Sequence, residues 1–174
     1  MSIFERKVKV NISTHDPIVK AVNWPKQSHY IELSEKAIMQ RRDYIKMPKS
    51  DYDEMMSYLK IYNSLEETAS NNNNGILAEK EGRIDDAIRI YENSILDEYP
   101  ATHSYDRLMI LYRKRKDYEN EIRVIKIAIR VFEKERMERD RLGVGSDNTA
   151  KEVNRYKLRL EKAEALMAKA SQVK

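Results

Sequence analysis

The chain has three histidines, a residue type that can support metal binding or acid–base chemistry. His15, His29 and His103 lie far apart and show neither the His-x-x-x-His nor the Glu-x-x-His spacing that places zinc ligands on one helix. A zinc site would need these histidines to converge from distant segments. We therefore predict no metal site.

Two pairs of neighbouring carboxylates, Asp85-Asp86 and Glu66-Glu67, resemble an acid–base couple. Adjacent residues on a helix point about 100° apart, so neither pair aims both carboxylates at one point. Acids at a turn-to-helix junction interact favourably with the helix dipole. A structural role is therefore favoured for both pairs.

Signatures of cofactor and nucleophile chemistry are also missing. The segment Gly143-Val144-Gly145 lacks the further glycine and the helix-opening context of a dinucleotide loop, and no Gly-Lys-Ser/Thr phosphate loop occurs. The chain has no cysteine, which excludes disulfides, thiolate metal sites and thiol catalysis. We expect a protein that is not an enzyme and holds no cofactor.

The formal net charge of +4 is unevenly distributed. Residues 1–50 carry ten basic and five acidic side chains, residues 51–106 carry four and thirteen, and residues 107–174 carry nineteen and eleven. An acidic middle between basic ends suggests charge complementarity within or between chains at least as readily as it suggests nucleic acid.

Composition indicates an all-α protein of one domain. Charged residues make up 36% of the 174 positions, with only four glycines and four prolines, which is typical of helices with ion-paired outer faces. The N-terminus lacks the apolar core of a secretory signal, and no stretch approaches the roughly 18 apolar residues of a membrane span. A cytoplasmic protein without membrane association is expected.

The first part of the chain gives the weaker structural predictions. Residues 1–30 read as an irregular N-terminal arm, in which residues 8–12 alternate like a strand that lacks a partner, and Trp24 is expected to pack the arm onto the helical body. The apolar pattern predicts a helix over residues 31–46, ended by Pro48, and a second from about Asp51 to Leu65. Residues 71–74 are four asparagines and, taken alone, favour a loop.

A repeat with a period of about 34 residues is the strongest pattern. The segment 82–91 is a turn followed by an amphipathic helix, and the repeat places it on segment 116–125. In this alignment Ile88-Arg89 matches Ile122-Arg123, and Ile95 matches Ile129. A fixed period of this length indicates stacked helix–turn–helix units.

These residues resemble the tetratricopeptide repeat (TPR) consensus over residues 68–133. The first unit offers Gly75, Gly82, Ala87, Tyr91, Ser94 and Pro100 near consensus places, and the second offers Tyr105, Leu108, Tyr112, Ala128 and Phe132. The departures are Asn71 and Asn74 at large apolar positions and Glu121 at a small one. The resemblance implies two helix pairs within a helical domain of residues 31–174, with flanking capping helices, of which the C-terminal one spans about residues 149–170. The segment 142–147 is expected to be a flexible connector.

In the TPR family the first helix of each repeat lines a groove that binds a partner segment. Carried over residue by residue, the resemblance implies a groove formed by Asn72, Ile76, Glu79, Lys80, His103, Asp106, Ile110, Arg113 and Lys114. The function that it implies is an adaptor or scaffold that binds a peptide or helix of another protein.

Two alternatives remain open. The basic segment 107–159 could bind nucleic acid, with Arg115, Lys116, Arg123 and Arg130 as candidate polyanion contacts, although acidic residues interleave with these cations. Exposed apolar surface at a repeat end, together with opposite charges along the chain, could instead drive self-assembly into a homo-oligomer.

Overall fold

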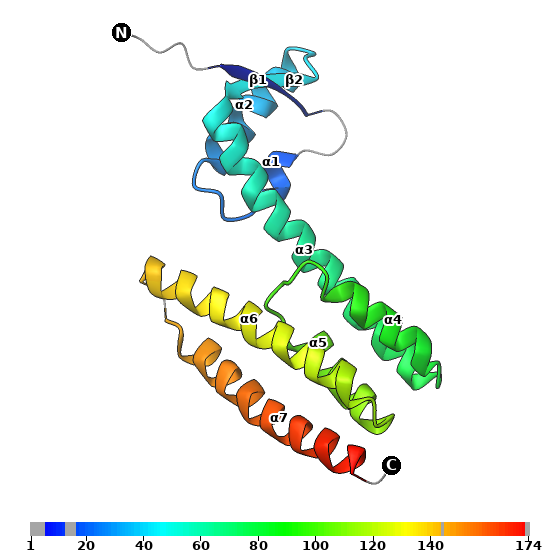
Figure 1. Cartoon of the computed structure of the whole chain (residues 1–174). Coiled ribbons are helices and arrows are strands. Elements are labelled where there is room, and N and C mark those ends of the chain that lie inside the picture. The colour runs from blue at the N-terminus through cyan, green and yellow to red at the C-terminus, as the bar shows by residue number, and fades with distance from the viewer. Residues whose placement is uncertain (1–5, 13–16, 144, 173–174) are drawn as a thin grey trace. The chain divides into compact units, whose positions relative to one another are not determined.

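A computed structural model describes residues 6–12, 17–143 and 145–172 of the chain. Its elements, in chain order, are β1 (Lys7–Asn11), α1 (Pro17–Lys20), α2 (Gln27–Met39), β2 (Tyr44–Pro48), α3 (Lys49–Lys80), α4 (Ile84–Ser94), α5 (Thr102–Lys114), α6 (Tyr118–Leu142) and α7 (Asp147–Ser171) (Figure 1). The all-α prediction is confirmed, with one small two-stranded sheet in addition.

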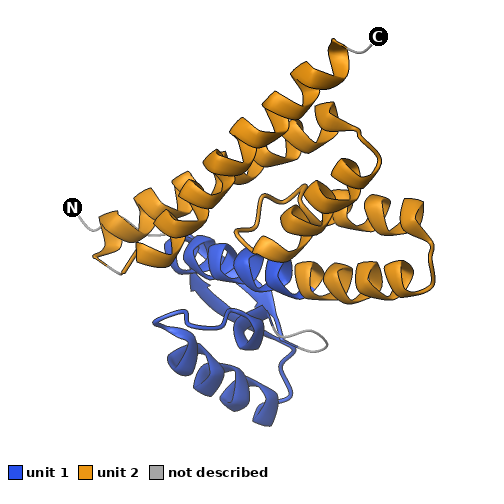
Figure 2. Ribbon diagram, turned by 90° about the horizontal axis from the view of Figure 1, so that it is seen from below, with its two compact units in different colours: residues 1–66 blue, residues 67–174 orange. Residues whose placement is uncertain are grey.

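The chain forms two compact units, residues 1–66 and residues 67–174 (Figure 2). The sequence pattern had placed the boundary after residue 30 instead. Described residues on both sides of that position, such as Val10, Trp24 and Met47, share one hydrophobic core, which explains why they form one unit.

Unit 1 corrects the expectation of an irregular arm over its described residues. Strand β1 pairs with β2 in antiparallel register, with Val8 opposite Met47 and Val10 opposite Ile45. The expected helix over residues 31–46 ends at Met39, because the alternating segment 44–48 becomes the partner strand. The sequence did not reveal the partner of β1, because β2 follows α2 in the chain and its first residues continue a pattern that predicts a helix.

The core of unit 1 gathers residues from every one of its elements. Trp24 is 2% exposed and stacks on Tyr30 of α2, with ring centroids 5.1 Å apart. Tyr30 donates a hydrogen bond to Asp51 of α3 at 2.5 Å, and Lys26 forms ion pairs with Asp51 and Glu54 at 2.7 and 2.8 Å. Trp24 therefore packs inside this unit, near the first turns of the long helix α3.

Helix α3 runs through the four asparagines, so the loop reading of residues 71–74 is wrong. Asn71 is half-buried and Asn74 is exposed, whereas Gly75 and Ala78 are buried. Burial of the small residues against α4 outweighs the weak helix propensity of asparagine.

Unit 2 is a series of helices, each packed against the next. Contacts join α4 to α5, α5 to α6, and α6 to α7, and the last two lie side by side as long antiparallel helices (Figure 1). One continuous core fills the space between them, centred on the fully or almost fully buried side chains Tyr91, Tyr105, Leu108, Ile125 and Tyr156.

The turns between these helices use left-handed backbone. Gly82 (φ 75°) separates α3 from α4, Lys116 (φ 58°) precedes α6, and Gly143 (φ 69°) ends α6 as its C-cap. Glycine is the residue that adopts this conformation without steric cost. Helix α7 spans Asp147–Ser171, against the expected 149–170, and Val144 of the expected connector lies outside the described residues.

Candidate binding face

The end of helix α3 lies alongside helix α5. Asn72 of α3 accepts a hydrogen bond from Ser104 of α5 at 2.6 Å. Farther along both helices, Arg107 of α5 donates its Nε–H to Glu79 of α3 at 2.9 Å. Both contacts advance in the same direction along the two helices, so the end of α3 and the helix α5 run parallel.

A second bridge joins α5 to α7. The guanidinium of Arg155 donates to both carboxylate oxygens of Asp106, at 2.9 and 3.0 Å. This bidentate geometry is the strongest form of side-chain ion pairing. The helices α3, α5 and α7 are thus linked in order by polar side chains.

A third cluster lies where α5, α6 and α7 meet. Glu121 of α6 is fully buried and accepts hydrogen bonds from Arg113 Nε at 2.9 Å and Arg159 Nε at 3.2 Å. The two guanidinium groups come from α5 and α7. Glu121 occupies the place that the TPR consensus gives to a small residue, and these two arginines explain how a carboxylate is accommodated there.

Three predicted groove residues, Glu79, Asp106 and Arg113, are therefore engaged in contacts within the chain. The Arg107 hydrogen bond holds the pKa of Glu79 below its usual value, and the Tyr91 hydroxyl and the Lys114 charge act in the same direction. The charge of Lys114 thus acts on the Glu79 carboxylate, consistent with the close approach of α3 and α5.

His103 lies against the core more than on an open surface. Its ring packs edge-on to Tyr91 of α4, with centroids 5.7 Å apart. Its Nε2 is buried and has no hydrogen-bond partner in the part of the chain that the structure describes. Of the other two histidines, His29 belongs to unit 1, and His15 lies outside the described residues.

The remaining predicted residues define one face of the stack. Ile76 is one turn from both Asn72 and Glu79, so it lies on the side of α3 that faces along α5. Ile110 is one turn beyond Asp106, which contacts α7, and three positions beyond Arg107, which contacts α3. Ile110 is half-buried, and by helical spacing it lies between these two directions.

Helix α7 adds a residue that the repeat pattern did not reveal. Leu158 is three positions beyond Arg155 and lies on the side of α7 that carries this arginine, with 59% of the residue exposed. By helical spacing from these contacts, Ile76, Ile110 and Leu158 lie on corresponding sides of three linked helices, and we call these three residues the apolar row. We call the surface formed by Ile76, Ile110, Leu158 and the exposed Lys80, Lys114 and Lys162 the first-helix face.

A signal for Leu158 was present in the sequence at a different period. An alignment of segment 105–112 with segment 153–160 places Tyr105, Leu108 and Tyr112 on Val153, Tyr156 and Leu160. The same alignment places Ile110 on Leu158. Helix α6 is longer than α4, which has the matching place in the repeat. The 34-residue period that relates the two helix pairs therefore does not align α7 with α5.

The candidate polyanion contacts are mostly paired within the chain. Each of three predicted cations meets an acidic residue of α4 or of the segment after it: Arg115 with Asp85 at 2.6 Å, Arg123 with Glu92 at 2.5 Å, and Arg130 with Glu98. Lys116 is exposed and makes no ion pair with the residues that the structure describes. Acidic residues from the middle of the chain are thus balanced by cations of α6 and of the turn before it.

Metal-binding and membrane-spanning features are absent from the described residues. Within these ranges, no three His, Asp or Glu side chains gather as metal ligands would. None of the described helices is both long and apolar enough to cross a bilayer. No protein-family model, curated protein or solved structure matches this chain.

Proposed function

We propose that this chain is a non-catalytic, TPR-like interaction module of the cytoplasm, which acts as an adaptor and binds a segment of a partner protein on its first-helix face. The observation that carries the proposal is the row Ile76, Ile110 and Leu158 across three linked helices. Apolar side chains that recur on adjacent helices provide a continuous surface for an amphipathic segment.

The charges around the row support a partner of particular chemistry. Glu79, Asp106 and Arg113 already have partners within the stack, whereas Lys80, Lys114 and Lys162 are exposed and make no ion pair with other described residues. The face therefore offers an apolar centre and a positive border. We expect a helix or extended segment with apolar side chains on one side and carboxylates beside them.

Nucleic acid binding has weaker support. Arg115, Arg123 and Arg130 would have to exchange carboxylate partners for phosphates. Exposed ion pairs of this kind contribute only about 0–1 kcal/mol each, so the exchange is feasible, but no observation favours it. A protein partner is therefore the better supported assignment.

The test is affinity capture from the native host with the intact chain, Ile110→Asp and the control Leu96→Asp. Leu96 is also an apolar residue of unit 2, 74% exposed, but lies in the segment after α4. We expect specific proteins that Ile110→Asp loses and Leu96→Asp retains, both variants keeping the wild-type helical circular dichroism. Capture that disappears on nuclease treatment, or that Ile110→Asp does not affect, would contradict the proposal.

Light scattering of the purified chain distinguishes self-assembly from binding of a different protein. A monomer at high micromolar concentration is expected from a face that binds a different protein. A homo-oligomer that Ile110→Asp dissociates would assign the same face to a second copy of the chain.

A further inference from the structure

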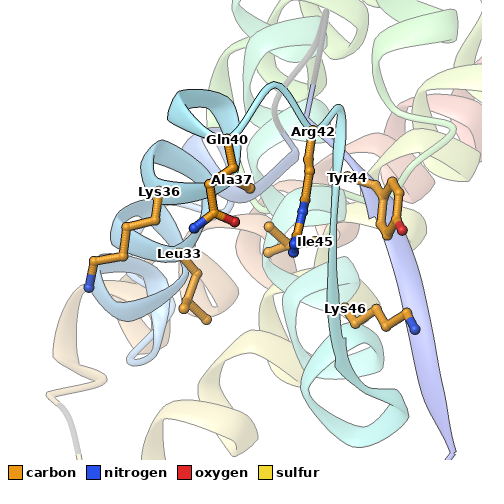
Figure 3. Close-up of a pocket in the computed structure, with 8 residues that line it drawn as sticks. All are labelled: Leu33, Lys36, Ala37, Gln40, Arg42, Tyr44, Ile45 and Lys46. Carbon is orange, nitrogen blue, oxygen red and sulfur yellow. The ribbon is translucent and has the colours of Figure 1, made fainter.

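Unit 1 contains a pocket between helix α2 and strand β2. The pocket has a volume of about 570 Å³, within the range of natural ligand sites, and is lined by Leu33, Lys36, Ala37, Gln40, Arg42, Tyr44, Ile45 and Lys46 (Figure 3). Leu33, Ala37 and Ile45 form its apolar part. It is independent of the first-helix face, which belongs to unit 2.

One wall of this pocket is formed by β2, and among the described residues no strand pairs with the edge of β2 opposite β1; we call this the free edge. Ile12 donates its N–H to the Asp43 carbonyl and Lys49 donates to the Arg6 carbonyl, both at 2.8 Å. In an antiparallel ladder, bonded residues alternate along each strand, so Ile45 and Met47 also direct their backbone groups toward β1. The N–H and C=O groups of Tyr44 and Lys46 consequently point to the opposite edge.

The pocket is positively charged. Lys36, Arg42 and Lys46 line it, and no lining residue is a carboxylate. None of these three cations forms an ion pair with the residues that the structure describes. Figure 3 shows the Arg42 side chain between α2 and β2 beside Ile45, with the Lys36 and Lys46 ammonium groups on opposite sides of it.

Strand β1 adds to this charge. Lys9 is the register partner of Lys46, and its ammonium lies 4.6 Å from the centre of the Tyr44 ring. Like charges directly opposite each other destabilise a sheet. An anionic group bound between Lys9 and Lys46 would remove this repulsion.

We propose that the free edge of β2 binds an extended acidic peptide segment as a third strand. Its backbone pairs with the N–H and C=O groups of Tyr44 and Lys46. Successive side chains of the bound peptide point to opposite faces of the sheet. Apolar side chains on one face pack on Leu33 and Ile45, and carboxylates on the other face pair with Lys46 and Lys9. Arg42 binds a carboxylate at the pocket itself. Pro48, which has no N–H, ends the pairing edge.

Lysines and a proline on an edge strand also serve to prevent unwanted strand pairing. That explanation predicts no binding of any strand, and it requires neither the pocket nor unpaired Arg42. The two explanations are therefore separated by experiment.

The test uses the full chain and a labelled peptide of alternating valine and glutamate, six residues long. Binding is followed by fluorescence anisotropy, and backbone amide exchange is followed by NMR. We expect slower exchange of the Tyr44 and Lys46 amides at saturation, with the Ile45 and Met47 amides unchanged because they already pair with β1. Protection of all four amides, or of none, would overturn strand addition.

Variants and altered peptides identify the interactions. We expect Arg42→Ala and Lys46→Ala each to weaken binding about tenfold, which corresponds to about 1.4 kcal/mol. Lys20→Ala, an exposed cation of α1 in the same unit, should change nothing. The same peptide with N-methylated backbone amides should not bind, and a valine–lysine peptide should not bind.

Three outcomes would overturn the proposal. Equal binding of the N-methylated peptide would show attraction of charge alone. Displacement of the peptide by millimolar inorganic phosphate would assign the pocket to small anions, and stronger binding of an oligonucleotide would assign it to nucleic acid. Failure of this site would leave the function proposed for unit 2 untouched, because the two tests use different residues.

Discussion

Arg113 of α5 donates its Nε–H to the carboxylate of Glu121 at a distance of 2.9 Å, and Glu121 is fully buried. Arg159 of α7 approaches the same carboxylate at 3.2 Å. One acidic side chain at a position where a small residue was expected thus connects three helices. This arrangement makes Glu121 a structural centre of unit 2 and takes Arg113 out of the set of residues free to bind a partner.

Glu121→Ala is expected to destabilise the chain by about 3 kcal/mol. Removing one member of a buried ion pair leaves the other charges uncompensated, and the partial exposure of both arginines keeps the cost at the lower end of the usual range. Urea unfolding measures the change. Glu121→Gln should lose less, because the amide oxygen still accepts a hydrogen bond.

The matched control is Glu119→Ala, two positions earlier on the same helix and exposed. Its effect should stay within about 0.5 kcal/mol, as for ordinary surface substitutions. Equal effects at positions 119 and 121 would refute the structural role of the buried carboxylate.

Gly75→Ala is expected to destabilise unit 2, although alanine is normally more favourable than glycine in a helix by about 1 kcal/mol. A Cβ at this position would lie 2.5 Å from Cζ of Tyr91, a ring that is itself fully buried. Overpacking of this kind costs about 1–3 kcal/mol, so after the gain in helix propensity the expected net destabilisation is about 0–2 kcal/mol. Gly145→Ala, which meets no atom within 4 Å, is the control.

A double-mutant cycle isolates the contact between α3 and α4. In a Tyr91→Leu background the smaller side chain leaves room for the new methyl group, so the cost of Gly75→Ala should fall. An unchanged cost would mean that Tyr91 is not the source of the clash.

Glu79 is expected to contribute to stability at neutral pH and to lose that contribution in acid. Its pKa is held below the usual value near 4.5, chiefly by the Arg107 hydrogen bond. A carboxyl with a lowered folded-state pKa stabilises above its unfolded pKa, and the contribution disappears as the pH falls through the folded one. Glu79→Gln should cost about 2 kcal/mol at pH 7 and progressively less below about pH 4.5.

The measurement for Glu79 is the urea midpoint of both proteins as a function of pH. Glu67→Gln, an exposed glutamate of the same helix, serves as the control and should show no such trend. A difference between wild type and Glu79→Gln that stays constant down to about pH 2 would contradict the ion pair.

Tyr112 is expected to ionise near pH 12. Burial, together with the hydrogen bond that the hydroxyl donates to Glu92 at 2.6 Å, raises its pKa to about 12. An exposed tyrosine titrates near pH 10. Because the folded-state pKa is the higher one, the associated stability is complete below about pH 10 and is lost as the pH rises toward 12.

The difference between the tyrosinate absorbance of wild type and of Tyr112→Phe reports this one group. Glu92→Gln should lower the titration midpoint of Tyr112 only part of the way toward pH 10, because the Tyr112 hydroxyl stays buried. A midpoint near pH 10 in the wild type would show that Tyr112 is open to solvent.

Local patterns in the sequence predicted unit 2 better than unit 1, for identifiable reasons. The helices that contain Ala87 and Ile122 have strong apolar periodicity, and each follows a turn at Gly82 or Lys116. The bounds of these helices can therefore be predicted from residues close in sequence. The strand pair β1–β2 depends on a contact between residues 7–11 and 44–48, which no local pattern reveals. The asparagine run likewise became helical through packing of Gly75 against Tyr91.

The candidate site was only partly predictable for a similar reason. Ile76 and Ile110 were predicted only as what the resemblance to the TPR consensus implies, carried over residue by residue. The engagement of Asp106 with Arg155 and of Arg113 with Glu121 depends on pairings between different helices, which periodicity alone does not reveal. Leu158 was missed because the length of α6 breaks the repeat.

The most direct test of the central claim is site-specific photo-crosslinking in the native host. A photoreactive amino acid replaces Ile110 on the first-helix face or, in a separate protein, the exposed Lys126 of α6. We predict a discrete adduct with another protein from position 110, lost when Leu158→Asp is added, and no such adduct from position 126. Equal adducts from both positions, or adducts from position 126 alone, would contradict the claim that this face binds the partner.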